Sequence, residues 1–389
     1  MNRKALLLLF VVLTLAVSSV FATESRMAAL GNPFGFIRDN TDIHAYPGVI
    51  HQYENNVRAE LPSTSNLINE DWKLGANLPF LNNKLGIYLN TDTKINVATH
   101  LPTANNFVPG DLDISKKIQF YYGFMDKFGV GFGMAIDSKK KDLADNPDKF
   151  AELSASYFEL TGGMSDEKMD IGVGLGFWGA GTKNDIDQNE TSMGGFGFSA
   201  QGRYFLMDTD EFGLVAAANL GLMSGSDEQK FASTDTQDYS MMNFDLGVGL
   251  DYQFSDMHKL IFGFKPLNLI SEGWESTDPS GTDKGSKSWL YLPTYTLGLE
   301  SQITPWMVGR VGATQKYAFY GYNNDPNGNA NTETAEYQSG FNMDMGLGFK
   351  FGKFCIDTVL SQSLLHDGPN FIGGKSNGLA GNVSVDFNY

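Results

Sequence analysis

The sequence is poor in the residues that tie compact secreted domains or metal sites together. It contains a single cysteine, Cys355, among 389 residues. One thiol excludes an intramolecular disulfide framework and any zinc site built from several cysteines. We therefore expect neither a disulfide-stapled fold nor a structural metal.

Basic residues are also scarce. The chain has 28 Lys and Arg against 45 Asp and Glu, which gives a formal net charge of −17. This balance argues against nucleic acid as a partner and favours charged, well-solvated loops.

Long apolar runs are confined to residues 1–22, MNRKALLLLFVVLTLAVSSVFA. Arg3 and Lys4 give a positive start, Ala5–Val17 an apolar run, and Val20–Ala22 a small-residue cleavage site. This layout predicts a secretory signal peptide. A retained anchor is the alternative, but the apolar run is shorter than the roughly 20 residues that a spanning helix needs.

What the chain does contain is strict alternation of hydrophobic and polar residues. Between Tyr337 and Phe351 hydrophobic side chains occupy nearly every second position, with Asn, Asp, Gly and Lys between them. A period of two predicts a strand, and about 15 residues exceeds the five or six typical of soluble strands. The pattern returns at 128–136, 169–177, 242–254 and 379–389, whereas no amphipathic helix of matching quality appears.

The connections between these strands alternate in length. Short turns alternate with long loops rich in Asn, Asp, Gly and Pro, such as ESTDPSGTDKGSKS at 275–288. This asymmetry is typical of antiparallel outer-membrane β-barrels, and the spacing predicts about 16 strands over 49–389, with about 14 as the main alternative. A soluble β-sandwich is disfavoured by the strand length and by the glycines on the polar faces. The apolar faces should therefore contact lipid, where only a closed barrel satisfies every backbone group.

The end of the chain carries a second outer-membrane feature. In NVSVDFNY the alternation ends on Phe387 and Tyr389, which resembles the C-terminal signal read by the barrel assembly machinery. We expect this machinery and outer-membrane lipid as partners and the bacterial outer membrane as the location. The oligomeric state stays open.

Residues 23–48 do not alternate and carry several glycines and prolines around a polar patch. We predict that they form a hatch inside the lumen, the alternative being a segment that hangs in the periplasm. The glycine-rich inner faces near 129–133, 172–176 and 246–249 leave room for an inserted backbone. The residues expected to form the hatch contacts are Arg38, Asp39, Asn40, Asp42, Tyr46 and Pro47.

This segment, RMAALGNPFGFIRDNTDIHAYPG, resembles the N-terminal segment of FadL-type long-chain fatty-acid channels and related PorV-like barrels. Ala28–Gly31 matches their small-residue stretch, and Asp39, Asn40 and Asp42 match their acidic patch. The sequence departs from the pattern at Tyr46–Gly48, where those proteins often have Asn-Pro-Ala. The resemblance implies a hatch inside the barrel and passage of hydrophobic molecules, without identifying the ligand.

No catalytic motif is present. The chain has neither a G-x-S-x-G elbow nor an H-E-x-x-H metal motif. A triad assembled from distant residues stays possible in principle, but we expect no enzyme activity, no cofactor and no metal. The five tryptophans, Trp72, Trp178, Trp274, Trp289 and Trp306, fall near predicted strand ends and suggest interfacial anchors.

Ionisable residues on the predicted inner faces are the candidates for lining the lumen. Both signs are represented, which suits a wall whose charges pair across strands rather than a strongly ion-selective pore. The candidates are Lys73, Asp170, Arg203, Asp245, Asp251, Lys265, Glu300, Arg310, Asp344 and Asp357.

Together these features predict a passive outer-membrane channel for small solutes, hydrophobic ones if the FadL-type resemblance holds. One alternative is a barrel that does not transport and presents its loops to partners, as a scaffold or in secretion. A general porin for polar solutes is the other.

Overall fold

The computed structural model describes residues 23–33, 35–53, 55–62, 72–93, 114–143, 146–184, 190–230, 234–278, 281–325, 332–360 and 380–389. Sixteen antiparallel strands follow one another around a closed barrel, and β1 completes it by pairing with β16. The predicted strand number and fold class are therefore confirmed. The strands are β1 (Asn56–Pro62), β2 (Lys73–Phe80), β3 (Asn83–Asp92), β4 (Lys116–Phe124), β5 (Phe128–Leu143), β6 (Asn146–Ser165), β7 (Met169–Asn184), β8 (Glu190–Asp208), β9 (Phe212–Lys230), β10 (Thr234–Ser255), β11 (His258–Asp278), β12 (Gly281–Thr304), β13 (Met307–Asp325), β14 (Thr332–Phe351), β15 (Phe354–Leu360) and β16 (Ala380–Asn388).

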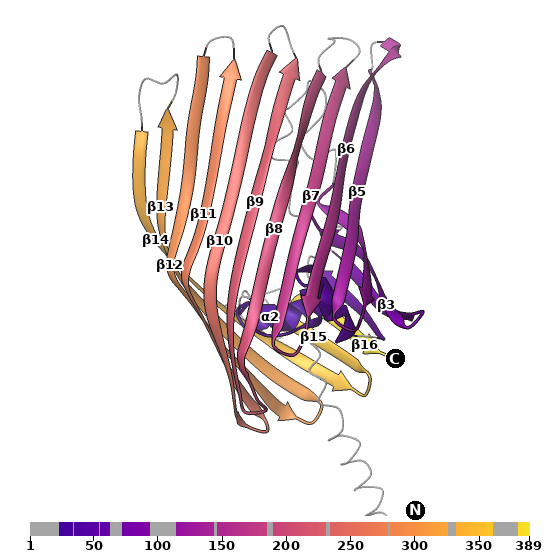
Figure 1. Ribbon diagram of the computed structural model, residues 1–389, viewed down its shortest axis with the longest axis vertical. Helices are drawn as coiled ribbons and strands as arrows, with labels where there is room; N and C mark the ends of the chain where they lie inside the picture. Colours follow the sequence, from indigo (N-terminus) through magenta and orange to yellow (C-terminus); the bar gives the residue numbers. More distant parts are fainter. Residues whose placement is uncertain are drawn as a thin grey trace, which may run out of the picture.

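The barrel wall has two heights (Figure 1). Strands β5 to β14 hold 16 to 24 residues, whereas β1 to β4, β15 and β16 hold 7 to 10. A tilted transmembrane strand needs about 9–11 residues. The short strands are therefore close to or below the length that crosses the membrane, and the tall ones extend well beyond it.

The tall strands run into segments predicted as loops. Within residues 275–288, β11 continues to Asp278 and β12 begins at Gly281. The composition is that of a loop, but Glu275 pairs with Lys284 across the hairpin, with 3.0 Å between carboxylate and ammonium. Where both faces of a sheet meet water, polar residues form strands as readily as apolar ones.

Alternation sends apolar side chains outward and polar side chains inward. On the outer face Phe196, Leu297 and Phe341 are 50%, 51% and 67% exposed. On the inner face Asp170 and Thr296 are completely buried. This is the reverse of a soluble barrel, and lipid is the solvent that such an outer surface requires.

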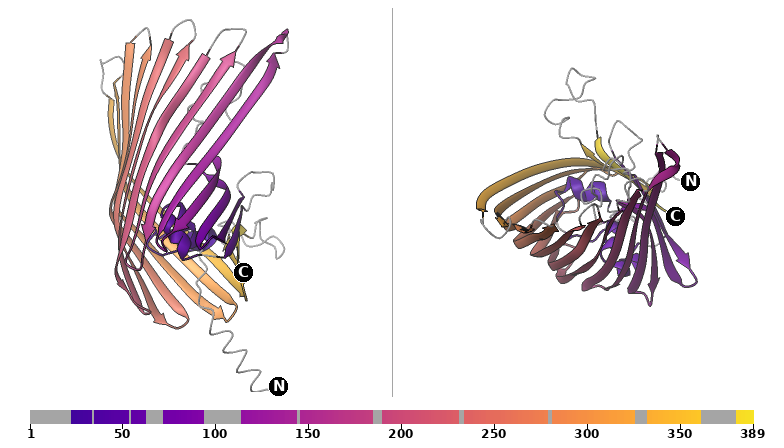
Figure 2. Two further views of the ribbon diagram at one scale, coloured as in Figure 1. Left: turned by 45° about the vertical axis from the view of Figure 1, so that its right-hand side comes forward. Right: turned by 90° about the horizontal axis from the view of Figure 1, so that it is seen from above.

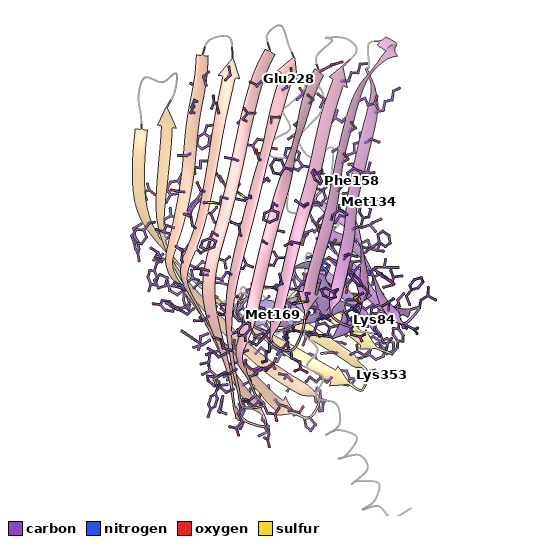
Figure 3. The ribbon with its side chains drawn as sticks, viewed as in Figure 1. Lys84, Met134, Phe158, Met169, Glu228 and Lys353 are labelled. Carbon is purple, nitrogen blue, oxygen red and sulfur yellow. The ribbon has the colours of Figure 1, made fainter. Side chains whose placement is uncertain are left out.

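The apolar outer band covers only the lower part of the tall strands. On β9 the outward residues are leucine and alanine from Leu214 to Leu222, and then become Ser224, Ser226 and Glu228. Strand β10 changes in the same way between Met242 and Ser240. In Figure 3, Met134 and Phe158 lie side by side at middle height, and Glu228 lies near the upper rim. The band thus marks the membrane, with an aqueous extension above it.

The first strand begins later than predicted. The sequence placed the start of the barrel at residue 49, but Pro47–His51 forms the 3-10 helix η2 and β1 starts at Asn56. Proline suits the first position of a helical turn, and Val49 and Ile50 are completely buried. Before η2 come the helix α2 (Glu24–Ala29) and the 3-10 helix η1 (Asn40–His44). No helix in the described part of the chain is long and apolar enough to cross a membrane.

A charge inserted into the apolar band should destabilise the barrel, whereas one above it should not. Val173 is outward-facing and 47% exposed. We expect V173K to lower the free energy of unfolding by about 2–4 kcal/mol and S226K by at most about 1 kcal/mol. Urea unfolding in lipid vesicles measures both, and equal losses would contradict this position of the membrane.

Candidate functional site

Residues 23–51 lie inside the barrel, near the end that carries the short turns, and are called the plug below. Helix α2 packs against β13 to β16, and η2 packs against β3 to β7 on the other side of the lumen. The view from above shows α2 enclosed by strands (Figure 2). The plug therefore spans the lower lumen from wall to wall.

The wall is shaped to receive the plug backbone. A Cβ atom at Gly172 would lie 1.8 Å from the carbonyl oxygen of Ala45, and one at Gly312 would lie 2.1 Å from the amide nitrogen of Gly31. At Gly249 it would lie 2.3 Å from Phe36 Cβ. No side chain fits at such distances, so glycine at these wall positions leaves the space that the inserted segment occupies.

Arg203 on β8 is the main fastening between wall and plug. Its side chain is fully buried, and its Nε donates to Asp170 Oδ2 on the neighbouring strand at 2.6 Å. Its Nη2 donates to Asp42 Oδ2 of the plug at 2.5 Å, and its Nη1 donates to the carbonyl oxygen of Gly35 at 2.7 Å. One guanidinium thus binds a wall carboxylate, a plug carboxylate and the plug backbone together.

A second fastening holds the start of the plug. Arg26 binds both carboxylate oxygens of Glu300, at 2.8 and 3.2 Å. Arg310 binds Glu300 at 2.7 Å and Asp357 at 2.5 Å, and the hydroxyl of Thr23 donates to Asp357 at 2.9 Å. The helix α2 is thereby tied to β12, β13 and β15.

The acidic patch of the plug makes hydrogen bonds within the plug as well as contacts with the wall. Asp39 and Asp42 form a capping box at the start of η1. Burial raises the pKa of both carboxyl groups, that of Asp42 to about 7, and the positive charge of Arg203 opposes the rise. Asn40 lies between them and donates to Asp386 Oδ2 at 2.5 Å, while Arg58 donates to its amide oxygen at 2.7 Å.

Most of the predicted lumen residues lie around the plug. Lys73 pairs with Glu24 of the plug at 3.0 Å, and Arg38 of the plug reaches Asp170 at 3.3 Å. The backbone of Tyr46 and Pro47 continues from η1 into η2 beside the wall. Four predicted residues are elsewhere: Asp251 pairs with Lys259, Asp344 accepts from Asn342 at 2.6 Å, and Lys265 and Asp245 pair with each other at 2.9 Å beside a cavity.

That cavity, of about 330 Å³, lies in the lumen directly against the plug. The plug contributes His44, and strands β6 to β10 contribute the inner wall, including Tyr157, Thr161, Met223 and Asp245. Its size is at the lower end of small-molecule sites. No lysine or arginine is among the described residues that line it.

Glu159 is the most constrained polar group of this cavity. Its carboxylate accepts from Lys117 at 2.7 Å, from Gln119 at 3.0 Å and from the hydroxyl of Tyr157 at 2.6 Å. His44 contacts the hydroxyl of Tyr121 at 2.9 Å. Burial, followed by nearby cations, lowers the pKa of His44 well below its usual range, so the imidazole is neutral.

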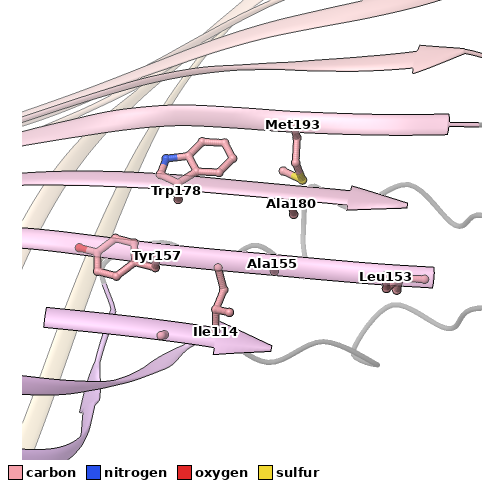
Figure 4. Packing of buried hydrophobic residues seen from close by; sticks show 8 residues of the cluster. Ile114, Leu153, Ala155, Tyr157, Trp178, Ala180 and Met193 are labelled. Carbon is pink, nitrogen blue, oxygen red and sulfur yellow. The ribbon is translucent and has the colours of Figure 1, made fainter. Parts of the chain in front are cut away.

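Above the cavity the inner wall becomes apolar (Figure 4). Ile114, Leu153, Ala155, Tyr157, Trp178, Ala180 and Met193 form one buried cluster, with Met223 and Tyr239 packed against it. The rings of Trp178 and Tyr239 stack with centroids 5.6 Å apart. This apolar cluster shares Tyr157 and Met223 with the cavity, so the two are continuous.

The position of Trp178 corrects the prediction of an interfacial tryptophan. It is only 4% exposed and faces the lumen, because it shares a face with Gly195 and Tyr239 on the neighbouring strands. Trp72 and Trp306, at 42% and 46% exposed, lie on the surface. Proximity to a strand end does not decide which face a residue occupies; register does.

Sequence reasoning found Asp245 but missed the other ionisable residues of the cavity. Neither Glu159 nor His44 was among the predicted lumen residues, although Glu159 alternates with Tyr157, Thr161 and Gly163 on one face. That alternation was the available signal. Among the described residues, no group of three or more His, Cys, Asp or Glu side chains is arranged to hold a metal ion.

Removing the Arg203 guanidinium should unfasten the plug. R203M leaves the buried Asp42 without its cation and Asp170 with Arg38 alone, and breaking a buried ion pair typically costs about 3–5 kcal/mol. We expect hydrogen exchange in residues 35–46 to accelerate strongly, while K259M, which removes the partner of Asp251, leaves it unchanged. Unaltered exchange in R203M would show that the plug does not depend on this contact.

No protein-family model matches the chain, and no curated protein matches its sequence. Similar solved structures include a FadL homologue of Pseudomonas aeruginosa, at 11% identity and a TM-score of 0.42, over 94% of this chain and 98% of that one. The toluene transporter TbuX of Ralstonia pickettii follows at 10% and 0.37, over 95% and 98%. The CymD monoaromatic hydrocarbon channel is similar at 10% and 0.37, over 96% and 99%.

Proposed function

We propose that this protein is a passive channel in the bacterial outer membrane for small apolar solutes. The observation that carries the proposal is the apolar cluster inside the lumen, continuous with a cavity of about 330 Å³ against the plug. A water-filled pore has polar walls, whereas Leu153, Trp178 and Met193 stand on an inner face. Apolar side chains there favour a solute that shares their preference for leaving water.

The proposed path has an apolar filter above and a polar closure below. Ions and sugars keep their hydration shells and are excluded from the apolar cluster, as in hydrophobic constrictions that act by dewetting. An apolar solute can make van der Waals contacts with the apolar side chains of the cluster in place of the contacts that it leaves. It therefore passes the cluster and reaches the cavity. Below it the plug, held by Arg203 and Glu300, keeps the lumen closed to water and salt.

The plug should limit ion flow. Deleting residues 23–48 removes α2, η1 and the ion pairs of Arg26 and Asp42, leaving an open lumen. We expect single-channel conductance in planar bilayers to rise several-fold. Heat-modifiable migration of the variant checks that the barrel still folds, and an unchanged conductance would count against the plug as the barrier.

A charge in the apolar filter should stop apolar solutes. Met223 lies between the cluster and the cavity, so M223D places a carboxylate on the proposed path. The measurement is entry of the apolar dye N-phenylnaphthylamine into Gram-negative cells with an intact lipopolysaccharide layer. We expect M223D to lower entry to the level of cells without the protein.

The matched control is S226D, three residues along the same strand, where the outward side chain is already in water. Entry through S226D should equal that of the native chain. If the native protein admits no dye, the scaffold alternative gains; if it admits sucrose instead, it is a polar-solute porin.

We also propose that the C-terminal aromatics are read during assembly. The Phe387 ring stacks on Phe354, with centroids 4.4 Å apart, and Tyr389 is 45% exposed. The exposed Tyr389 at the closing strand supports recognition by the barrel assembly machinery in the outer membrane.

A further inference from the structure

The cavity of the proposed channel carries carboxylates without a cation of its own. Glu159 and Asp245 both line it. Lys117 reaches Glu159 at 2.7 Å and Lys265 reaches Asp245 at 2.9 Å, but neither lysine is among the described lining residues. The lining therefore contains the acidic member of each ion pair, while its lysine lies outside the described lining.

The other polar groups of the cavity add no positive charge. The side chain of Asn219 donates to Asp245 at 3.0 Å, and the imidazole of His44 is neutral. The side-chain amides of Gln201 and Asn243 also line the cavity, and an uncharged amide can both donate and accept a hydrogen bond.

These groups treat an anionic and a neutral ligand differently. A carboxylate that leaves water needs a cation or several donors, and here it would meet two carboxylates instead. A hydroxyl or phenol group needs only an acceptor for its proton and a donor for its oxygen. The carboxylates offer the first, and the side-chain amide of Asn243 offers the second.

We infer that the cavity selects neutral apolar molecules with one hydroxyl-type head group, and rejects carboxylates of the same length. The inference rests on the proposed function, because it names the solute class of that channel. The apolar cluster around Trp178 and Met193 receives the hydrocarbon part, and Glu159, Asn243 and Asp245 receive the head group.

The test compares 1-octanol with octanoate, which have the same chain length and differ in head-group charge. Titration calorimetry uses the full-length protein in lipid nanodiscs at about pH 8, with empty nanodiscs as the blank. We expect octanol to bind at least about tenfold more tightly than octanoate.

The variant D245N removes one carboxylate and leaves the cation of Lys265 uncompensated beside the cavity. This variant should raise the affinity for octanoate several-fold and so lower the ratio of octanol affinity to octanoate affinity. The matched control D251N removes a wall carboxylate that also pairs with a lysine but lies outside the cavity, and should leave the ratio unchanged. E159Q, at the opposite side of the cavity, should act in the same direction as D245N.

The outcomes separate the inference from the function on which it rests. Equal binding of the two probes, or tighter binding of octanoate, overturns the charge selection while leaving an apolar site in place. Heat no greater than that of empty nanodiscs for both probes overturns the site, and with it the proposed channel for apolar solutes.

Discussion

The buried contact of Arg203 with Asp170 and Asp42 is the constraint on which the lumen depends. Two carboxylates from different parts of the chain are taken out of water together, and only a guanidinium with several donors satisfies both. Because the same side chain also binds the carbonyl oxygen of Gly35, charge and backbone are fixed by one group. The plug is therefore held at one defined position by these contacts, and is not only enclosed by the barrel wall.

Two kinds of interaction divide the lumen along its axis. Its lower half is held by ion pairs and by close backbone contacts at wall glycines such as Gly172, which fix the position of the plug. Its upper half is lined by Trp178, Met193 and their neighbours, whose contacts are weak individually and without direction. Between the two halves, the cavity beside Glu159 combines an apolar wall with a few oxygen atoms.

On the outer surface, the membrane requires apolar residues and the water above it requires hydrophilic ones. Outward residues are apolar from Leu214 to Leu222 on β9 and hydrophilic from Ser224 onward, so one strand crosses two solvents. Lipid requires every backbone group to pair within the sheet, and the β1–β16 contact completes this. The long strands above the band need no lipid, which explains why polar segments such as 275–288 extend the sheet.

The sequence by itself determined the barrel, its sixteen strands and the direction of its faces, because a period of two is a local property of the backbone. It also placed Arg203, Asp170, Glu300 and Asp357 on inner faces for the same reason. Only the tertiary structure decided that Arg203 meets Asp42, 161 residues away, and that Trp178 faces the lumen. Partners across the barrel follow from register and closure, which no short window of sequence contains.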